Sequence, residues 1–136
     1  MTASTDRAQK SGVLSAVRLT ALLTTIAALA QFLIGGYLFT ASNAGLVSVH
    51  NILGLVTLVA GIAATVAAFM FTKRGGNRGL AFHILGTTVL ILVQYGLGEM
   101  ISSQALTIVH MVLGIAILIS AIAMTTLAFR KPFARV

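Results

Sequence analysis

The stretch VHNILGLVTLVAGIAATVAAF, from Val49 to Phe69, decides the fold of this chain, because a second copy of it follows. The copy, from Val109 to Phe129, reads VHMVLGIAILISAIAMTTLAF, and the two agree at almost half of their positions without a gap. Both segments are apolar and long enough to form a membrane-spanning helix. Each also keeps a histidine, His50 and His110, which such a helix does not need in order to be apolar.

Four apolar runs dominate the 136 residues, of which 58% are hydrophobic and only 8% are charged. Each run reaches the roughly 18 residues that indicate a transmembrane helix. A soluble domain of this size does not bury so much apolar surface. The sequence therefore predicts an all-α, polytopic membrane four-helix bundle, a single domain over residues 1–136, with helices at about 17–39, 47–71, 80–98 and 105–129.

The four predicted helices form two tandem two-helix repeats. The first helix contains Gln31-Phe-Leu-Ile-Gly35, and the third contains Gln94-Tyr-Gly-Leu-Gly98, so both read glutamine, aromatic, two residues, glycine. Because both repeats enter the membrane in the same direction, we expect a pseudo-twofold axis along the membrane normal.

The basic residues lie on one side of the predicted bundle. Nine Lys and Arg residues precede the first helix, separate the second from the third, or follow the fourth, and they give a net charge of +7. The loops at 40–46 and 99–104 carry none. The positive-inside rule then predicts an inner membrane protein with both termini and the loop at 73–78 in the cytoplasm. The charge needs no nucleic-acid partner, and we expect the polar tail Met1–Ser11 to fray.

The two histidines are predicted near the outer ends of their helices, about 5–7 Å below the helix starts. Gln31 and Gln94 fall in the outer halves of the preceding helices, so all four side chains can face the outer half of the bundle, and the glutamines are candidate cofactor-binding residues. A twofold axis would exchange His50 with His110, so the pair can converge on that axis. A flat ligand with two axial positions fits there, which favours haem iron between two neutral imidazoles. The absence of cysteine excludes covalent c-type attachment.

Small residues line the same face below the histidines. Gly54 and Gly114 follow one turn further on, where a missing side chain would let a porphyrin lie close to the backbone. Further along, the stripe predicts that the second helix packs on the fourth, with Gly61 facing Ala121. Plain helix packing also explains such a stripe.

A family resemblance rests on the spacing of Gln94, Leu97, Gly98 and His110, which resembles one half of haem A synthase. The chain looks most like small bacterial four-helix membrane proteins that carry this pattern twice, and the likeness spans about residues 31–129. It implies that His50 and His110 are axial ligands of haem b, in a cytochrome b-like protein of electron transport or haem handling.

The chain departs from the synthase in three ways. Its outer loops offer no Lys or Arg for the propionates of a haem. The synthase has an acidic residue three positions before a catalytic-half histidine and often an arginine directly after it, whereas Val47 and Asn51 occupy those positions around His50. Only one four-helix unit is present, so a donor half and a catalytic half do not both exist here. The resemblance therefore implies haem binding rather than haem A synthesis.

Other interpretations stay open at this point. A histidine near a membrane interface is often simply tolerated, and an intramembrane glutamine often hydrogen-bonds a neighbouring helix. His83, near the cytoplasmic start of the third helix, is interpreted as such an interfacial residue. Asp6 and Glu99 are the only carboxylates, which disfavours a proton-coupled transporter or a hydrolase.

The alternative to a haem protein is a non-catalytic accessory or assembly subunit of a larger membrane complex, such as a respiratory complex, without a cofactor. The lipid bilayer is the expected surrounding in either case. A quinone or a larger membrane complex is the expected partner.

Overall fold

The structure is a computed structural model that describes residues 3–41 and 43–130, and from residue 3 to residue 8 it describes the backbone alone. This part of the chain forms four α-helices and no strand: α1 Ala3–Thr40, α2 Ala44–Thr72, α3 Arg78–Glu99 and α4 Gln104–Phe129. All four are long and apolar enough to cross a membrane. The prediction of an all-α, multi-pass membrane protein is confirmed at this level.

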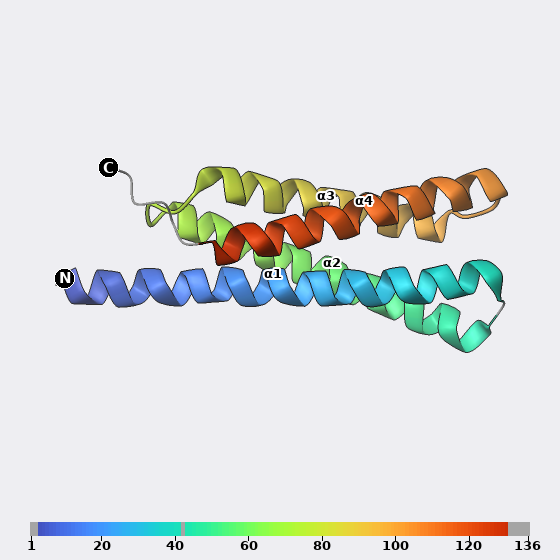
Figure 1. Ribbon diagram of the computed structural model, residues 1–136, viewed down its shortest axis with the longest axis horizontal. Helices are drawn as coiled ribbons and strands as arrows, with labels where there is room; N and C mark the ends of the chain where they lie inside the picture. The colour runs from blue at the N-terminus through green and yellow to red at the C-terminus, as the bar shows by residue number, and fades with distance from the viewer. Residues whose placement is uncertain (1–2, 42, 131–136) are drawn as a thin grey trace.

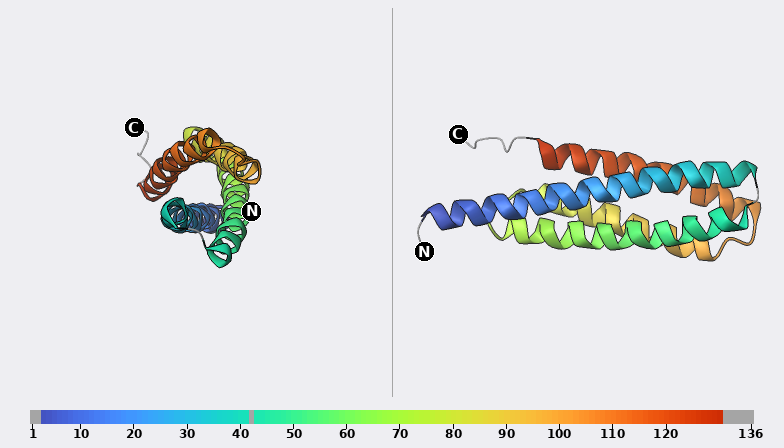
Figure 2. Two further views of the ribbon diagram at one scale, coloured as in Figure 1. Left: turned by 90° about the vertical axis from the view of Figure 1, so that its right-hand side faces the viewer. Right: turned by 90° about the horizontal axis from the view of Figure 1, so that it is seen from below.

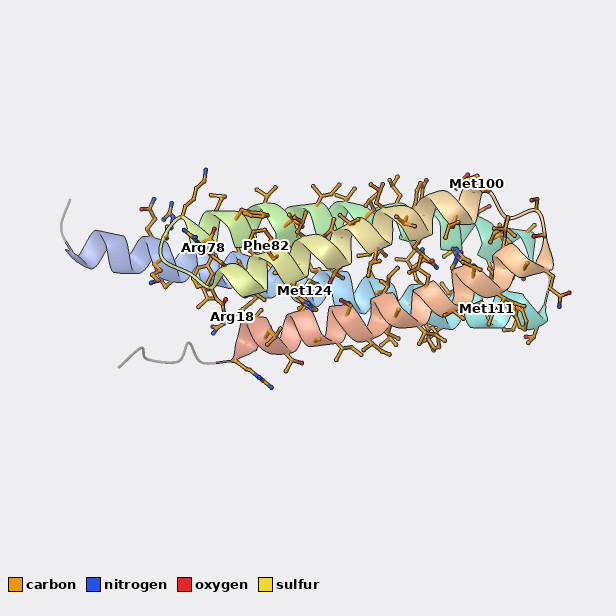
Figure 3. The ribbon with its side chains drawn as sticks, turned by 90° about the horizontal axis from the view of Figure 1, so that it is seen from above. Arg18, Arg78, Phe82, Met100, Met111 and Met124 are labelled. Atoms are coloured by element: carbon orange, nitrogen blue, oxygen red, sulfur yellow. The ribbon has the colours of Figure 1, made fainter. Side chains whose placement is uncertain are left out.

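The helices run alternately up and down, and successive helices are neighbours, with α4 also packing against α1 (Figures 1 and 2). The α1–α2 and α3–α4 loops lie at one end of the bundle, here called the histidine end. The α2–α3 loop, Ala3 and Arg130 lie at the other, here called the basic end (Figure 1). Figure 3 shows Met100 and Met111 towards the histidine end and Arg18 and Arg78 towards the basic end.

Local capping explains where three of the helices begin. The side chain of Asn43 accepts a hydrogen bond from Leu46 N at 3.0 Å, and Ser103 accepts one from Leu106 N at 3.3 Å. Asn77 does the same for Gly79 N at 2.8 Å. Each cap satisfies a backbone donor that would otherwise lack a partner in the first turn of the helix.

The polar N-terminal tail differs from the expectation that it would fray. The helix α1 extends back to Ala3 and projects beyond its neighbours at the basic end (Figure 2). Ala, Arg, Gln and Lys are good helix formers and no proline interrupts this segment, so helical propensity continues the apolar helix outwards. The first two residues of the predicted tail lie outside the described residues.

Small and hydroxyl-bearing side chains make up most of the buried residues, with a few large ones such as Ile84 and Met124, and many large apolar side chains cover the outside. Ala64, Ala121 and Thr24 have no exposed surface, whereas Ile52 and Ile119 are 65% and 64% exposed. In a lipid environment this arrangement is stable, because lipid solvates the outer leucines and isoleucines while small residues let the helix backbones approach closely.

Close packing is confined to the half of the bundle nearest the basic end. All buried residues fall within residues 17–28, 57–71, 80–91 and 117–128. None of the described residues from 29 to 56 or from 92 to 116 is buried. The histidine end therefore has no core of its own among the described side chains.

The expectation that α2 packs on α4, with Gly61 facing Ala121, is wrong. A Cβ atom at Gly61 would lie 3.1 Å from Thr88 Oγ1 of α3, and Thr88 donates a hydrogen bond to the Gly61 carbonyl at 2.9 Å. The Ala121 carbonyl accepts a hydrogen bond from Thr25 of α1 at 2.8 Å. Each small residue leaves room for a threonine hydroxyl of an adjacent helix, so α2 and α4 lie diagonally across the bundle.

Candidate functional site

The two histidines occupy equivalent positions on diagonal helices. His50 follows the α2 cap Asn43 by seven residues (43 to 50), and His110 follows the α4 cap Ser103 by seven (103 to 110). The centres of the two imidazole rings are 6.3 Å apart, and the ring planes are inclined by 64°. Both residues are half-buried. The fold thus brings two side chains 60 residues apart in sequence (50 to 110) into a facing pair.

A glutamine on the preceding helix supports each histidine. Gln31 Nε2 of α1 donates a hydrogen bond to the His50 carbonyl at 2.8 Å, and Gln94 Nε2 of α3 donates one to the His110 carbonyl at 2.9 Å. Each bond joins the two helices of one pair at the level of the histidine. The interpretation of the glutamines as hydrogen-bonding residues between helices agrees with these contacts.

Four polar atoms at this level are buried without a hydrogen-bond partner among the described residues: Gln31 Oε1, Gln94 Oε1, His50 Nδ1 and His110 Nδ1. Buried polar atoms are paired in most proteins, because leaving one unpaired costs about 1–3 kcal/mol. Here each half of the site holds one amide oxygen, which can only accept, and one ring nitrogen, which donates in one tautomer. The site therefore has matched, unused hydrogen-bonding capacity beside each histidine.

Two glycines lie against the histidine rings. A Cβ atom at Gly35 would lie 3.1 Å from His50 Cε1, and one at Gly98 would lie 3.2 Å from His110 Cε1. These distances are too short for any larger side chain unless the ring moves. In the sequence each of these glycines ends the repeated glutamine motif, and Gly98 also belongs to the spacing pattern that runs from Gln94 to His110. That repetition was the signal that could have identified them.

Gly54 and Gly114, the two glycines predicted beside a porphyrin, lie against the glutamine side chains of the neighbouring helices. A Cβ atom at Gly54 would lie 2.7 Å from Gln31 Nε2, and one at Gly114 would lie 3.2 Å from Gln94 Nε2. Their missing side chains make room for the glutamines that hold the histidine carbonyls. Gly54 and Gly114 thus contribute to the site through these side chains.

His83 lies outside this pair. Its Nε2 is 3.2 Å from the Ser120 carbonyl of α4, and the Ser120 hydroxyl is 2.7 Å from Thr87 Oγ1. The ring is eleven residues before Gln94 on α3, which is about 16 Å along the helix. His83 therefore ties α3 to α4 in the packed half of the bundle.

The two histidines form a pair that no third His, Cys, Asp or Glu side chain joins in the part of the chain that the structure describes. Within the described residues, no group of three or more His, Cys, Asp or Glu side chains is placed to hold a metal ion. Comparison with family models, with curated proteins and with solved structures found no match to this chain. A function for this chain is therefore inferred from the geometry of the site.

Proposed function

We propose that this protein binds one b-type haem within the membrane, with the imidazoles of His50 and His110 as its two axial ligands, and serves electron transfer or haem handling. The observation that carries this proposal is the pair of facing rings 6.3 Å apart. The resemblance to one half of haem A synthase also supports the proposal, because the pattern of glutamine, glycine and then histidine occurs twice in this chain.

The separation of the rings suits one metal ion between them. A metal–imidazole bond is about 2 Å long, so two nitrogens on opposite sides of one ion are about 4 Å apart. Each ring centre lies roughly 1 Å behind its nitrogen, which gives about 6 Å between centres for axial ligation of the kind that haem uses. The observed 6.3 Å agrees with this value.

The number of ligands points to haem rather than to a bare ion. A structural zinc site takes four protein ligands, and a catalytic one takes three. Two imidazoles suffice when a macrocycle supplies the remaining donors, as in haem. The chain has no cysteine, which excludes covalent c-type attachment and is compatible with a b-type haem. The lack of buried residues at the histidine end is compatible with a ligand completing the packing there.

The unpaired atoms beside the rings assign roles to Gln31 and Gln94. A ligating histidine generally donates its other ring N–H to an acceptor, which fixes the tautomer and the ring orientation. Among the described residues, the amide oxygens of Gln31 and Gln94 are buried acceptors without a partner. The Nδ1 atoms of the two histidines also lack a partner there and can donate when they carry the proton. In this proposal each Nδ1–H donates to the amide oxygen of its glutamine, directly or through one water, and leaves Nε2 free for iron.

The two-helix repeat and its pseudo-twofold axis are also part of the proposal. The contact of Thr25 with the Ala121 carbonyl matches that of Thr88 with the Gly61 carbonyl. The same two threonines also pair with hydroxyls, Thr25 with Thr125 at 2.8 Å and Thr88 with Thr65 at 3.0 Å. With the two Gln–His contacts, these pairs support an axis passing between His50 and His110.

For the orientation, we expect the basic end to face the cytoplasm of a bacterial inner membrane and the histidine end to face outwards. A single cysteine replacing Gln104 should then react with an impermeant thiol reagent added to intact cells. A cysteine replacing Asn77 should react only after the cells are opened. The reverse pattern of labelling would place the histidines in the cytoplasmic leaflet.

Titration with haemin tests the function itself. The detergent-purified protein should take up about one equivalent and show the sharp Soret band of low-spin, six-coordinate iron. The dithionite-reduced protein should remain six-coordinate. A protein that takes up no haem from excess haemin would contradict the proposal and favour the accessory-subunit alternative.

A further inference from the structure

We infer that a cleft at the basic end binds the phosphate of an anionic phospholipid headgroup. The cleft has a volume of about 670 Å³ and is lined by Gln9, Lys10, Met70, Lys73 and Arg74. It lies at the opposite end of the bundle from the histidines, so the inference stands whether or not haem is bound.

The fold brings the basic groups of the cleft together from two distant segments. Lys10 lies on the projecting part of α1, whereas Lys73 and Arg74 follow the end of α2. Gly75, with a φ of +78°, turns the chain there, and a Cβ atom at this position would lie 3.7 Å from Lys10 Nζ. The Lys10 ammonium group therefore reaches the α2–α3 turn. Three like charges gathered around one cleft repel one another unless an anion lies between them.

The cleft residues differ from Arg18, another basic residue of the same half. Arg18 Nε donates a hydrogen bond to the Ala128 carbonyl at 3.0 Å, and its guanidinium lies 5.4 Å from the centre of the Phe129 ring. Among the described side chains, Lys10, Lys73 and Arg74 have no such partner and no carboxylate beside them. The Asp6 carboxylate, four residues before Lys10, is the acidic group nearest in sequence. Arg18 is thus used in packing, while the basic groups of the cleft have no partner among the described side chains.

The position of the cleft favours a lipid as the source of the phosphate. Met70, the apolar lining residue, is 47% exposed and belongs to the last turn of the apolar α2 helix. The basic groups Lys73 and Arg74 follow immediately, where the apolar helix ends. Basic pockets at such helix ends bind anionic headgroups, because lysines attract the phosphate and arginine donates a fork of hydrogen bonds to it. A free phosphate would interact with the basic groups but would make no apolar contact with Met70.

Native mass spectrometry of the detergent-purified protein, titrated with phosphatidylglycerol or phosphatidylcholine, tests the inference. Wild-type protein should bind the first phosphatidylglycerol about tenfold more tightly than phosphatidylcholine. Lys73→Gln with Arg74→Gln should weaken phosphatidylglycerol binding about 30-fold, and Lys10→Gln alone should weaken it about fivefold. A loss of affinity on replacing Lys10 is expected because Lys10, although it lies on α1, lines the same cleft as Lys73 and Arg74.

Arg78→Gln with Arg130→Gln is the matched control, since it removes two charges at the same end without touching the cleft. This pair should leave the affinity for phosphatidylglycerol within about twofold of wild type. If the control pair loses as much affinity for phosphatidylglycerol, the lipid is attracted by the overall charge of this end of the bundle and not bound in the cleft, and the inference is wrong. Equal affinity for the two lipids would also overturn it, as would displacement of the lipid by an equimolar amount of inorganic phosphate.

Discussion

Replacing either His50 or His110 with alanine is expected to abolish the low-spin, six-coordinate spectrum of the haem-loaded protein. The two rings face each other at 6.3 Å, so each supplies one side of the proposed iron site, and no third histidine lies nearby to substitute. The single variants should give five-coordinate, high-spin haem with affinity reduced at least about a hundredfold, and the double variant should bind none. Absorption and electron paramagnetic resonance spectra of protein loaded with excess haemin measure both effects.

His83→Ala is the matched histidine control. This ring contacts the Ser120 carbonyl about 16 Å along α3 from the level of the glutamines, so its loss should leave the spectrum unchanged. Gln94→Leu keeps both ligands and should stay six-coordinate, with a more positive reduction potential, because the His110 Nδ1–H loses its proposed acceptor. If His50→Ala and His110→Ala both retain the wild-type spectrum, the haem is bound elsewhere and the assignment of ligands is wrong.

The parts of the fold that depend on local sequence could be predicted. Apolar runs of membrane-spanning length set the four helices, and Asn43, Asn77 and Ser103 cap them close to the expected starts. The histidine positions followed from the repeat alone, because a duplicated polar residue in two apolar helices is not explained by hydrophobicity. Such features need no knowledge of which helices are neighbours.

The parts that depend on helix pairing could not be predicted in the same way. A stripe of small residues shows that a helix has a close neighbour but not which neighbour it is, so Gly61 was assigned to Ala121 instead of Thr88. The threonine hydroxyls that bond backbone carbonyls across α1–α4 and α2–α3 decide the pairing. A threonine hydroxyl in a membrane helix can also donate a hydrogen bond to a carbonyl of its own helix. The sequence alone therefore does not show which threonines bond a neighbouring helix.

The contacts of Gly35 and Gly98 with the histidine rings also depend on helix pairing, so they could not be predicted from the sequence. From these contacts we expect that a larger side chain at either glycine disrupts the site. Their Cβ positions lie 3.1 and 3.2 Å from the Cε1 atoms of His50 and His110. A valine at either position would displace the imidazole from its present position, because the ring is the group that its Cβ meets. Axial ligation tolerates displacements of only about 0.5 Å, so Gly35→Val or Gly98→Val should weaken haem binding at least about tenfold and introduce a high-spin component.

Nearby glycines of the same helices provide controls, because replacing them with valine changes the helix propensity by the same amount. A Cβ atom at Gly36 or Gly96 would meet nothing within 4 Å in the described structure. Gly36→Val and Gly96→Val therefore place the same β-branched residue in the same helices with open space around it, and they should bind haem as wild type does. Thermal unfolding of the haem-free proteins shows whether each pair is equally stable. If all four variants lose haem to the same extent, helix distortion is the cause. Wild-type spectra for Gly35→Val and Gly98→Val would show that these glycines do not position the ligands.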